Sequence, residues 1–118
     1  MKVLVVDDSK VMRLIVMRTL RQAGFACDVT EAVDGKQALE VIRTAPPDLV
    51  LSDWNMPEMT GIELLETLRA EGSPVKVGFV TTEGTAQMRT RATAAGALFL
   101  IAKPFTAEHF KAALGSVF

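Results

Sequence analysis

Apolar residues along the chain alternate between short unbroken runs and helical spacings of three and four. The first run, KVLVV at Lys2–Val6, has the length of a buried strand. The residues after it predict a helix over Ser9–Ala23 that is closed by Gly24. The predicted buried face of this helix consists of Met12, Ile15, Val16, Leu20 and Ala23.

The rest of the chain repeats the strand–helix order. Further strands are predicted at Cys27–Glu31, Asp48–Ser52, Val75–Val80 and Leu98–Ala102. Further helices are predicted at Asp34–Thr44, Thr60–Ala70 and Gly84–Ala95, and from Thr106 to the C-terminus with an apolar face of Phe110, Leu114 and Val117. Capping-box sequences begin two of these helices, at Asp34 with Gln37 and at Thr60 with Glu63.

Strict alternation of strands and helices predicts an α/β fold. Three of the strands are apolar almost throughout, which is typical of a parallel sheet covered by helices on both faces. We therefore expect a (βα)5 doubly wound domain over residues 1–118 with a five-stranded parallel sheet. Ligands of such sheets bind beyond the carboxyl ends of the strands, so a functional site is expected there.

Composition and charge narrow the function classes. The length of 118 residues fits one domain, and the net charge of −1 gives little support for nucleic-acid binding. No apolar run reaches the length of a membrane span. Cys27 is the only cysteine, so no internal disulfide can form, as expected of a protein in the reducing cytoplasm.

Polar residues follow four of the five predicted strands. In chain order they are Asp7-Asp8, Asp53, Thr81-Thr82 and Lys103-Pro104. Carboxylates gathered at one sheet edge would repel each other, and a hard cation such as Mg²⁺ relieves that repulsion through oxygen ligands. Lys103 and Thr81 add an ammonium and a hydroxyl that suit a phosphoryl group. Together these groups suit phosphoryl transfer, in which an aspartate can itself be the nucleophile.

Each of these residues alone also has an ordinary structural explanation. Asp8 could cap the first helix, and Lys103 could be a solvated loop residue. The complete set agrees with the place where this fold binds ligands, and this agreement favours the functional interpretation.

Four segments resemble the receiver domain of two-component response regulators. They are VLVVDDS near the N-terminus, LVLSDWNMPEMTG in the middle, VTTEG after the fourth strand and IAKPF after the fifth. The resemblance covers essentially the whole chain, and SDWNMP is similar to stand-alone chemotaxis regulators of the CheY type. It implies a flavodoxin-like sheet of strand order 2-1-3-4-5 and a single receiver domain without an output domain.

The resemblance also implies a phosphoacceptor and a metal site. Asp53 would attack the phosphorus of a phosphohistidine on a histidine kinase. Mg²⁺ would be bound by Asp7, Asp8, Asp53 and the backbone carbonyl of Asn55, with Asp7 acting through a metal-bound water.

Further roles follow from the same resemblance. Lys103 would pair with the phosphoryl oxygens, Thr81 would move to donate a hydrogen bond to them, and the Lys103–Pro104 peptide would be cis. Asn55 and Glu83 would flank the line of water attack and tune the rate of self-dephosphorylation.

One position departs from the family pattern. Receiver domains commonly have an aromatic residue three positions before the lysine, where this chain has Leu100, and the chain contains no tyrosine. Phe99 should point to the opposite face of the strand. Leu100 is thus the expected switch position, and the expectation of a flagellar-motor target that reads an aromatic there is weakened.

The first helix offers a candidate docking surface. Val11, Leu14 and Met17 recur at a spacing of three away from the predicted buried face. A histidine kinase or a histidine-phosphotransfer domain could dock there, framed by Arg13, Arg18 and Arg21; the alternative is the ordinary apolarity of protein surfaces.

Several functions remain open at this point. The first is a signalling switch that acts catalytically only on its own phosphate and binds a downstream protein, a flagellar motor switch among the candidates. The second is a relay intermediate that passes the phosphoryl group to a phosphotransfer domain. A phosphatase would place its nucleophile after strand one with a second Asp two residues on, whereas Asn55 occupies that position here. A flavin-binding electron carrier would need a phosphate-binding loop after the first strand, and Asp7 and Asp8 at that place would repel a phosphate.

Overall fold

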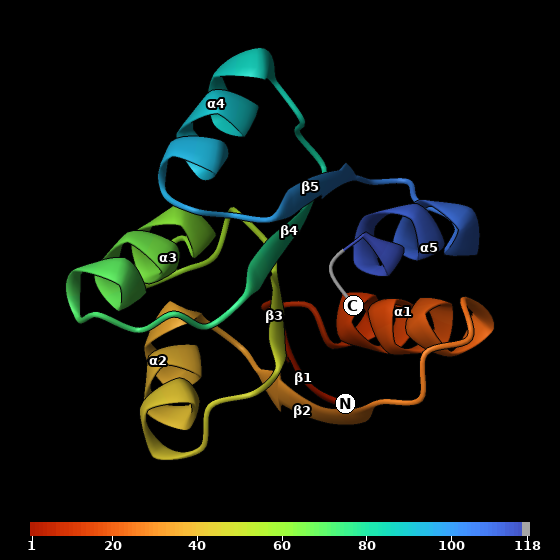
Figure 1. Ribbon diagram of the computed structural model, residues 1–118, viewed down its shortest axis with the longest axis horizontal. Coiled ribbons are helices and arrows are strands. Elements are labelled where there is room, and N and C mark those ends of the chain that lie inside the picture. Colours follow the sequence, from red (N-terminus) through yellow and green to blue (C-terminus); the bar gives the residue numbers. More distant parts are fainter. Residues whose placement is uncertain (117–118) are drawn as a thin grey trace.

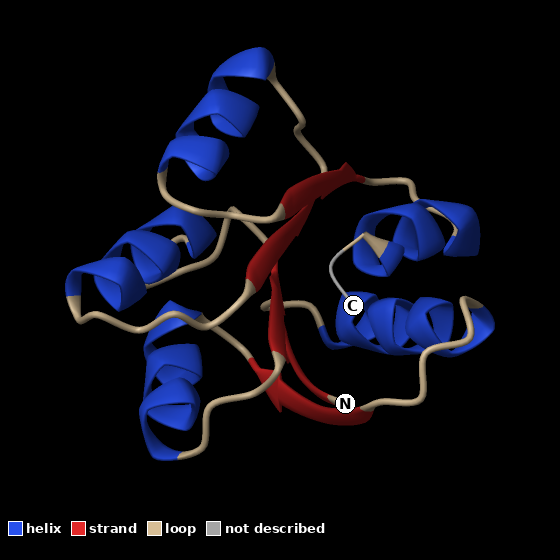
Figure 2. Ribbon diagram, viewed as in Figure 1, coloured by secondary structure: helices blue, strands red, loops and turns tan. Residues whose placement is uncertain are grey.

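The computed structural model describes residues 1–116 as alternating strands and helices (Figures 1 and 2). The strands are β1 (Lys2–Val6), β2 (Asp28–Ala32), β3 (Leu49–Ser52), β4 (Val77–Thr81) and β5 (Phe99–Ala102). The helices are α1 (Lys10–Gln22), α2 (Gly35–Thr44), α3 (Gly61–Ala70), α4 (Ala86–Ala94) and α5 (Ala107–Gly115). Val117, predicted for the apolar face of the last helix, lies outside the described residues.

The five strands form one parallel sheet in the order β2-β1-β3-β4-β5, which confirms the predicted fold class. Val6 at the end of β1 pairs with Ser52 at the end of β3. Thr81 at the end of β4 pairs with Ala102 at the end of β5. The residues that follow these strands therefore emerge at the same edge of the sheet.

Helices cover both faces of the sheet, with α1 and α5 on one side and α2, α3 and α4 on the other (Figure 1). Alternate strand residues serve the two layers, because successive side chains of a strand point to opposite faces. Val5 packs in the cluster beneath α1 and α5, and Val6 packs in the cluster beneath α2 and α3. Such strands are buried on both sides, which explains their unbroken apolar runs. Among residues 1–116, no helix is both long enough and apolar enough to cross a membrane.

Several predicted boundaries are wrong by one or two residues. The fourth strand was expected at Val75–Val80, but β4 spans Val77–Thr81. The Val75 carbonyl instead accepts a hydrogen bond of 2.8 Å from Arg69 Nη1, which holds this residue in the loop. The fourth helix begins at Ala86 because the Thr85 hydroxyl caps it, two residues after the predicted start at Gly84.

The predicted orientation of α1 is also wrong in part. Ile15, expected in the buried face, is 40% exposed, whereas Met17, expected on the exposed face, packs partly buried against the core. The buried residues of the helix are Arg13, Val16, Thr19 and Leu20. Arg13 occupies a core-facing position that a search for apolar residues cannot recognise, so the predicted buried stripe was placed too far toward Ile15.

Candidate functional site

Backbone hydrogen bonds bring the ends of β1 and β3 together. The Asp53 amide donates to the Val6 carbonyl at 2.8 Å, and the Asp7 amide donates to the Ala32 carbonyl at 3.1 Å. The first residues after the two neighbouring strands are thus held in the extension of the sheet. Both are aspartates, and they lie side by side at the predicted edge.

Three carboxylates form a cluster at this edge. Each of Asp7, Asp8 and Asp53 offers an oxygen atom, and these oxygens lie within 4.8 Å of one another. Asp7 is buried, Asp53 is partly buried and Asp8 is exposed, so the cluster opens to solvent on one side. Oxygen atoms so arranged fit a hard divalent cation.

Lys103 contributes a positive charge to this cluster. Its Nζ lies 3.2 Å from Asp7 Oδ2 and 3.7 Å from Asp53 Oδ2. The lysine follows β5, and its amide donates to the Thr81 carbonyl at 2.7 Å. The Lys103–Pro104 peptide is cis, as predicted.

The pKa of Asp53 is raised above its ordinary value. Burial of the carboxyl is the largest cause, and the neighbouring charges of Asp7 and Asp8 act in the same direction. Lys103 and the backbone N–H of Trp54 oppose the shift by stabilising the carboxylate. The site thus holds a carboxylate that would gain from the arrival of another positive charge.

The loop after Asp53 is packed closely against it. The Trp54 amide donates to Asp53 Oδ1 at 2.8 Å, and the Gly61 amide donates to the Trp54 carbonyl at 2.8 Å. A Cβ on Gly61 would collide with the carbonyl oxygen of Asp53, so only glycine lets α3 begin this close to the strand end. The Trp54 ring packs against Phe79 with centroids 5.0 Å apart.

The predicted rate-tuning and hydroxyl residues lie around the same edge. Asn55 and Glu83 are both exposed, on the loops that follow β3 and β4. Thr81 is the last residue of β4 and is fully buried, with its Oγ1 accepting from the Glu83 amide at 3.3 Å.

Leu100 and Phe99 point to opposite faces of β5, as predicted. Leu100 packs against the cluster on the α3 and α4 side, and Phe99 packs against the cluster on the α1 and α5 side. The Leu100 carbonyl accepts a hydrogen bond of 3.2 Å from Arg89 Nη1 on α4. The position that is commonly aromatic is thus a partly buried leucine next to α4.

Arg13 is a contributor to the site that the sequence did not reveal. It was expected to frame a docking surface, but its side chain is buried and its Nη1 donates to the Asp7 carbonyl at 2.7 Å. A buried arginine near an acid pair leaves no signal in hydrophobic periodicity. The expected docking stripe changes accordingly, with Val11, Leu14 and Ile15 exposed and Met17 partly buried.

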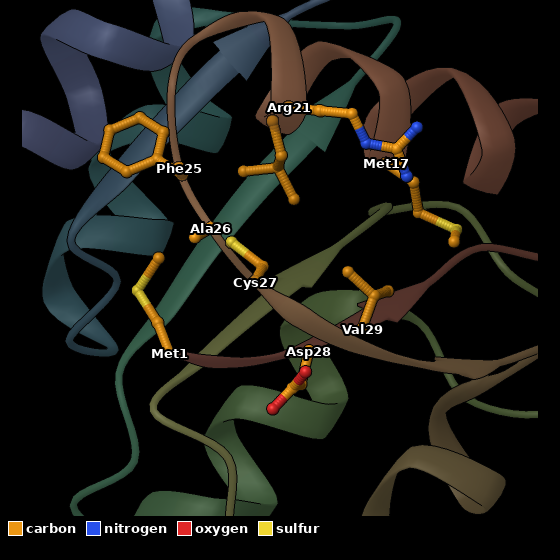
Figure 3. Close-up of a pocket in the computed structure, with 9 residues that line it drawn as sticks. Met1, Met17, Arg21, Phe25, Ala26, Cys27, Asp28 and Val29 are labelled. Atoms are coloured by element: carbon orange, nitrogen blue, oxygen red, sulfur yellow. The ribbon is translucent and has the colours of Figure 1, made fainter.

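A hollow of about 580 Å³ lies away from this cluster, between α1 and the start of β2 (Figure 3). Met17, Phe25 and Cys27 are among the residues that line it. Burial raises the pKa of the Cys27 thiol, so the thiol is protonated and a poor nucleophile at neutral pH.

Comparison with known proteins decides the family. Residues 3–115 match the response regulator receiver domain. The chain belongs to this family. It is 41% identical to a probable chemotaxis protein CheY of Rhizobium etli, an alignment that covers 99% of the chain and 92% of the relative. It is 42% identical to the chemotaxis protein CheY-3 of Vibrio cholerae, covering all of the chain and 92% of the relative.

Solved structures agree in fold. The chemotaxis protein CheY4 of Vibrio cholerae superposes with a TM-score of 0.86 at 36% identity, covering 99% of the chain and 98% of CheY4. The receiver domain of the response regulator NarL from Mycobacterium tuberculosis gives 0.87 at 30% identity, with coverages of 98% and 94%. The protein is a phosphorylation-activated signalling protein of the two-component type.

Proposed function

We propose that Asp53 is the phosphoacceptor of this receiver domain and that it takes its phosphoryl group from a histidine kinase. The observation that carries the proposal is the position of the Asp53 carboxylate, within 4.8 Å of Asp7 and Asp8 oxygens and 3.7 Å from Lys103 Nζ. The Trp54 amide donates a hydrogen bond of 2.8 Å to Asp53 Oδ1 and so holds this oxygen in place. The other oxygen faces Lys103.

The proposed transfer exchanges one bond for another. An Asp53 oxygen attacks the phosphorus of the phosphohistidine, a P–O bond forms, and the P–N bond breaks with its electron pair returning to the imidazole. Lys103 would pair with the phosphoryl oxygens, and its contact with Asp7 would loosen. Thr81, at the end of the neighbouring strand, supplies a hydroxyl donor. Catalysis of this kind consists of positioning and charge neutralisation.

We propose that the cation of this site is Mg²⁺, bound by Asp7, Asp8, Asp53 and the backbone carbonyl of Asn55. Its positive charge would offset the negative charge that the phosphoryl group brings to the cluster. The exposed Asn55 and Glu83 lie where water would approach, and their size and charge would set the lifetime of the phosphate. Beyond its own phosphorylation and dephosphorylation, we assign the protein no enzymatic activity.

The decisive experiment is phosphoryl uptake from phosphoramidate, which carries the same P–N bond as phosphohistidine. The wild-type protein with Mg²⁺ should gain one acid-labile phosphoryl group by intact-mass measurement, and Asp53→Asn should gain none. Asp28→Asn, an exposed aspartate on β2, serves as the control and should be labelled like the wild type. Labelling of Asp53→Asn would refute the assignment.

Chemotaxis is the most strongly supported setting. Both curated relatives described above are chemotaxis proteins, and neither comparison favours a relay intermediate. We propose a cytoplasmic switch that binds a downstream target when phosphorylated. Leu100 is the proposed switch position. A flagellar-motor target would have to recognise a leucine at that position.

The exposed face of α1 is the proposed docking surface for the kinase or a phosphotransfer domain. Val11 and Leu14 are 67% and 48% exposed, and Ile15 continues their stripe. Lys10 and Arg18 on the same helix are exposed. An apolar stripe edged by cations suits a partner helix with apolar and acidic residues.

Leu14→Asp should slow phosphoryl transfer from the protein's own kinase at least about tenfold, because a charge would be buried in the contact. Uptake from phosphoramidate, which needs no docking surface, should stay unchanged. Leu98→Asp is the matched control, since Leu98 is similarly exposed at 45% but precedes β5. Equal kinase reactivity of the Leu14 and Leu98 variants would contradict the docking proposal.

A phosphatase with an aspartyl-phosphate intermediate is the competing class. It would turn over a generic phosphate ester continuously, whereas the proposed switch takes up one phosphoryl group and releases it slowly. Steady release of phosphate from such an ester by the wild type, lost in Asp53→Asn, would favour the phosphatase.

A further inference from the structure

The turn between β1 and α1 is held by an arginine that has no role in the proposed phosphoryl transfer. Arg13 lies on the first turn of α1 and is only 9% exposed. Its Nη1 donates to the Asp7 carbonyl at 2.7 Å, and its Nε donates to Glu31 Oε1 on β2 at 2.8 Å. The planar guanidinium therefore joins the turn to the neighbouring strand with two donors of fixed relative direction.

Every polar atom of Asp7 is engaged. Its amide donates to Ala32, its carbonyl accepts from Arg13, its Oδ1 accepts from the Ser9 amide at 2.9 Å, and its Oδ2 faces Lys103 at 3.2 Å. Asp7 would keep its place through the remaining three contacts if one were lost. The Asp7 side chain alone therefore does not explain why a buried arginine is needed.

Asp8 is held differently. Within residues 1–116 its carboxylate makes no hydrogen bond or ion pair, so only the backbone directs it toward Asp7 and Asp53. The Asp7 carbonyl and the Asp8 amide belong to one rigid peptide plane. Fixing that carbonyl oxygen with Arg13 fixes the plane and, with it, the position of the Asp8 Cα, so that the direction of the Asp8 side chain then depends only on the dihedral angles of Asp8 itself.

We propose that Arg13, oriented by Glu31, is a positioning residue that fixes the Asp7–Asp8 peptide and so presents the Asp8 carboxylate to a divalent cation. The proposal rests on the proposed function of the cluster as a Mg²⁺ site. Groups that orient metal ligands from outside typically change metal affinity by about 10–100-fold when they are replaced. The cation itself does not touch Arg13.

The test is the Mg²⁺ affinity of the full chain, measured by isothermal titration calorimetry without any phosphodonor. Arg13→Met keeps the apolar stem and removes both donors, and it should weaken Mg²⁺ binding about tenfold. Arg13→Lys can reach only one of the two acceptors and should restore part of the affinity. Glu31→Gln keeps an acceptor for Arg13 and should bind within about twofold of the wild type, whereas Glu31→Ala frees the guanidinium and should bind more weakly.

Two controls separate positioning from a loss of stability. Val16→Ala removes buried side-chain volume from the same helix away from the cluster, and it should lower the free energy of unfolding yet leave Mg²⁺ affinity unchanged. In an Asp8→Asn background, Arg13→Met should cause no further loss of affinity, because the two residues act through the same ligand. Phosphoryl uptake by Arg13→Met at saturating Mg²⁺ should approach the wild-type rate, with only the apparent KM for Mg²⁺ raised.

The outcomes distinguish this proposal from the proposed function. If the wild type binds Mg²⁺ and takes up phosphate while Arg13→Met binds Mg²⁺ equally tightly, the positioning role is wrong and the function stands. An equal loss of affinity in Val16→Ala, or an undiminished effect of Arg13→Met in the Asp8→Asn background, also overturns the positioning role. Absence of Mg²⁺ binding in the wild type overturns both proposals. If Arg13→Met does not fold, the Mg²⁺ affinity of Glu31→Ala is the deciding measurement. A Mg²⁺ affinity of Glu31→Ala equal to that of the wild type would refute the positioning role of Arg13.

Discussion

Removing the charge of Asp53 should stabilise the protein when no divalent cation is present. In the wild type the Trp54 amide donates to Asp53 Oδ1 at 2.8 Å, and Asp53→Asn keeps an oxygen that can accept this hydrogen bond. The variant removes one of the three clustered negative charges. At an effective dielectric constant of about 20, two negative charges within 4.8 Å of each other repel by about 3–4 kcal/mol. The attraction between Asp53 and Lys103 at 3.7 Å, which the variant loses, is about 4 kcal/mol. Partial exposure of the cluster reduces the net gain to about 1–3 kcal/mol.

The gain should depend on pH in a definite direction. The pKa of Asp53 is raised in the folded protein, so the folded state holds its proton where the unfolded chain, with a value near 3.8, has lost it. Wild-type stability therefore falls relative to Asp53→Asn as pH rises from the unfolded pKa through the raised folded pKa. The advantage of the variant should be absent below the unfolded pKa of 3.8 and should grow as pH rises through the raised folded pKa.

Urea unfolding followed by far-ultraviolet circular dichroism, in the presence of a chelator, measures this difference. At neutral pH a gain of about 2 kcal/mol moves the midpoint by about 1 M for a typical slope. Asp28→Asn, remote from the cluster, should change stability by less than about 0.5 kcal/mol. Saturating Mg²⁺ should stabilise the wild type more than the variant and narrow the gap. A variant that is no more stable at neutral pH, or whose gain is the same at every pH, would refute the reasoning.

Three further variants test the site and, with Glu58, the loop between β3 and α3. Lys103→Met leaves the carboxylates without their cation and should destabilise the protein by about 1–3 kcal/mol at neutral pH but less in acid, as measured by urea unfolding. Gly61→Ala drives a Cβ into the Asp53 carbonyl and should cost about 1–3 kcal/mol and slow phosphoryl uptake. Gly115→Ala, where a Cβ meets nothing within 4 Å, is its harmless control. Glu58 adopts a left-handed φ of 70°, so Glu58→Asn should raise stability by about 0.5–1 kcal/mol in thermal unfolding, and an equal gain in Glu58→Gln would contradict this explanation.

The fold could be predicted because its signals are local. The strands β1, β3 and β4 are buried on both faces, so Lys2–Val6 and Asp48–Ser52 appear as apolar runs whatever the neighbouring strands are. The carboxyl ends of parallel strands meet at one edge, which is why Asp53 and Lys103 could be placed together although they are far apart in the sequence. The strand order itself was implied by family resemblance rather than by the pattern of residues.

Details that depend on the hydrogen-bond acceptors of buried or partly buried arginines could not be predicted. The start of β4 depends on which carbonyl Arg69 binds, and the orientation of α1 depends on where the Arg13 guanidinium finds acceptors. Neither partner is visible in the spacing of apolar residues. A long cationic side chain was assigned to the surface because that is its usual place, and only the fold supplies the buried carbonyl and the carboxylate of Glu31 that accommodate it.

The charges of the cluster connect cation binding to phosphorylation. Within residues 1–116, three carboxylates face one ammonium, because Arg13 nearby pairs with Glu31 at 2.8 Å and donates its other hydrogen bond to a carbonyl. A phosphoryl group on Asp53 would add negative charge to a site that already lacks positive charge. A bound divalent cation would favour the phosphorylated form, and phosphorylation would strengthen cation binding by the same factor, since such coupling between two ligands is reciprocal. Because Arg13 and Glu31 neutralise each other, the site retains its need for a cation, and the arginine can orient Asp8 without replacing the metal.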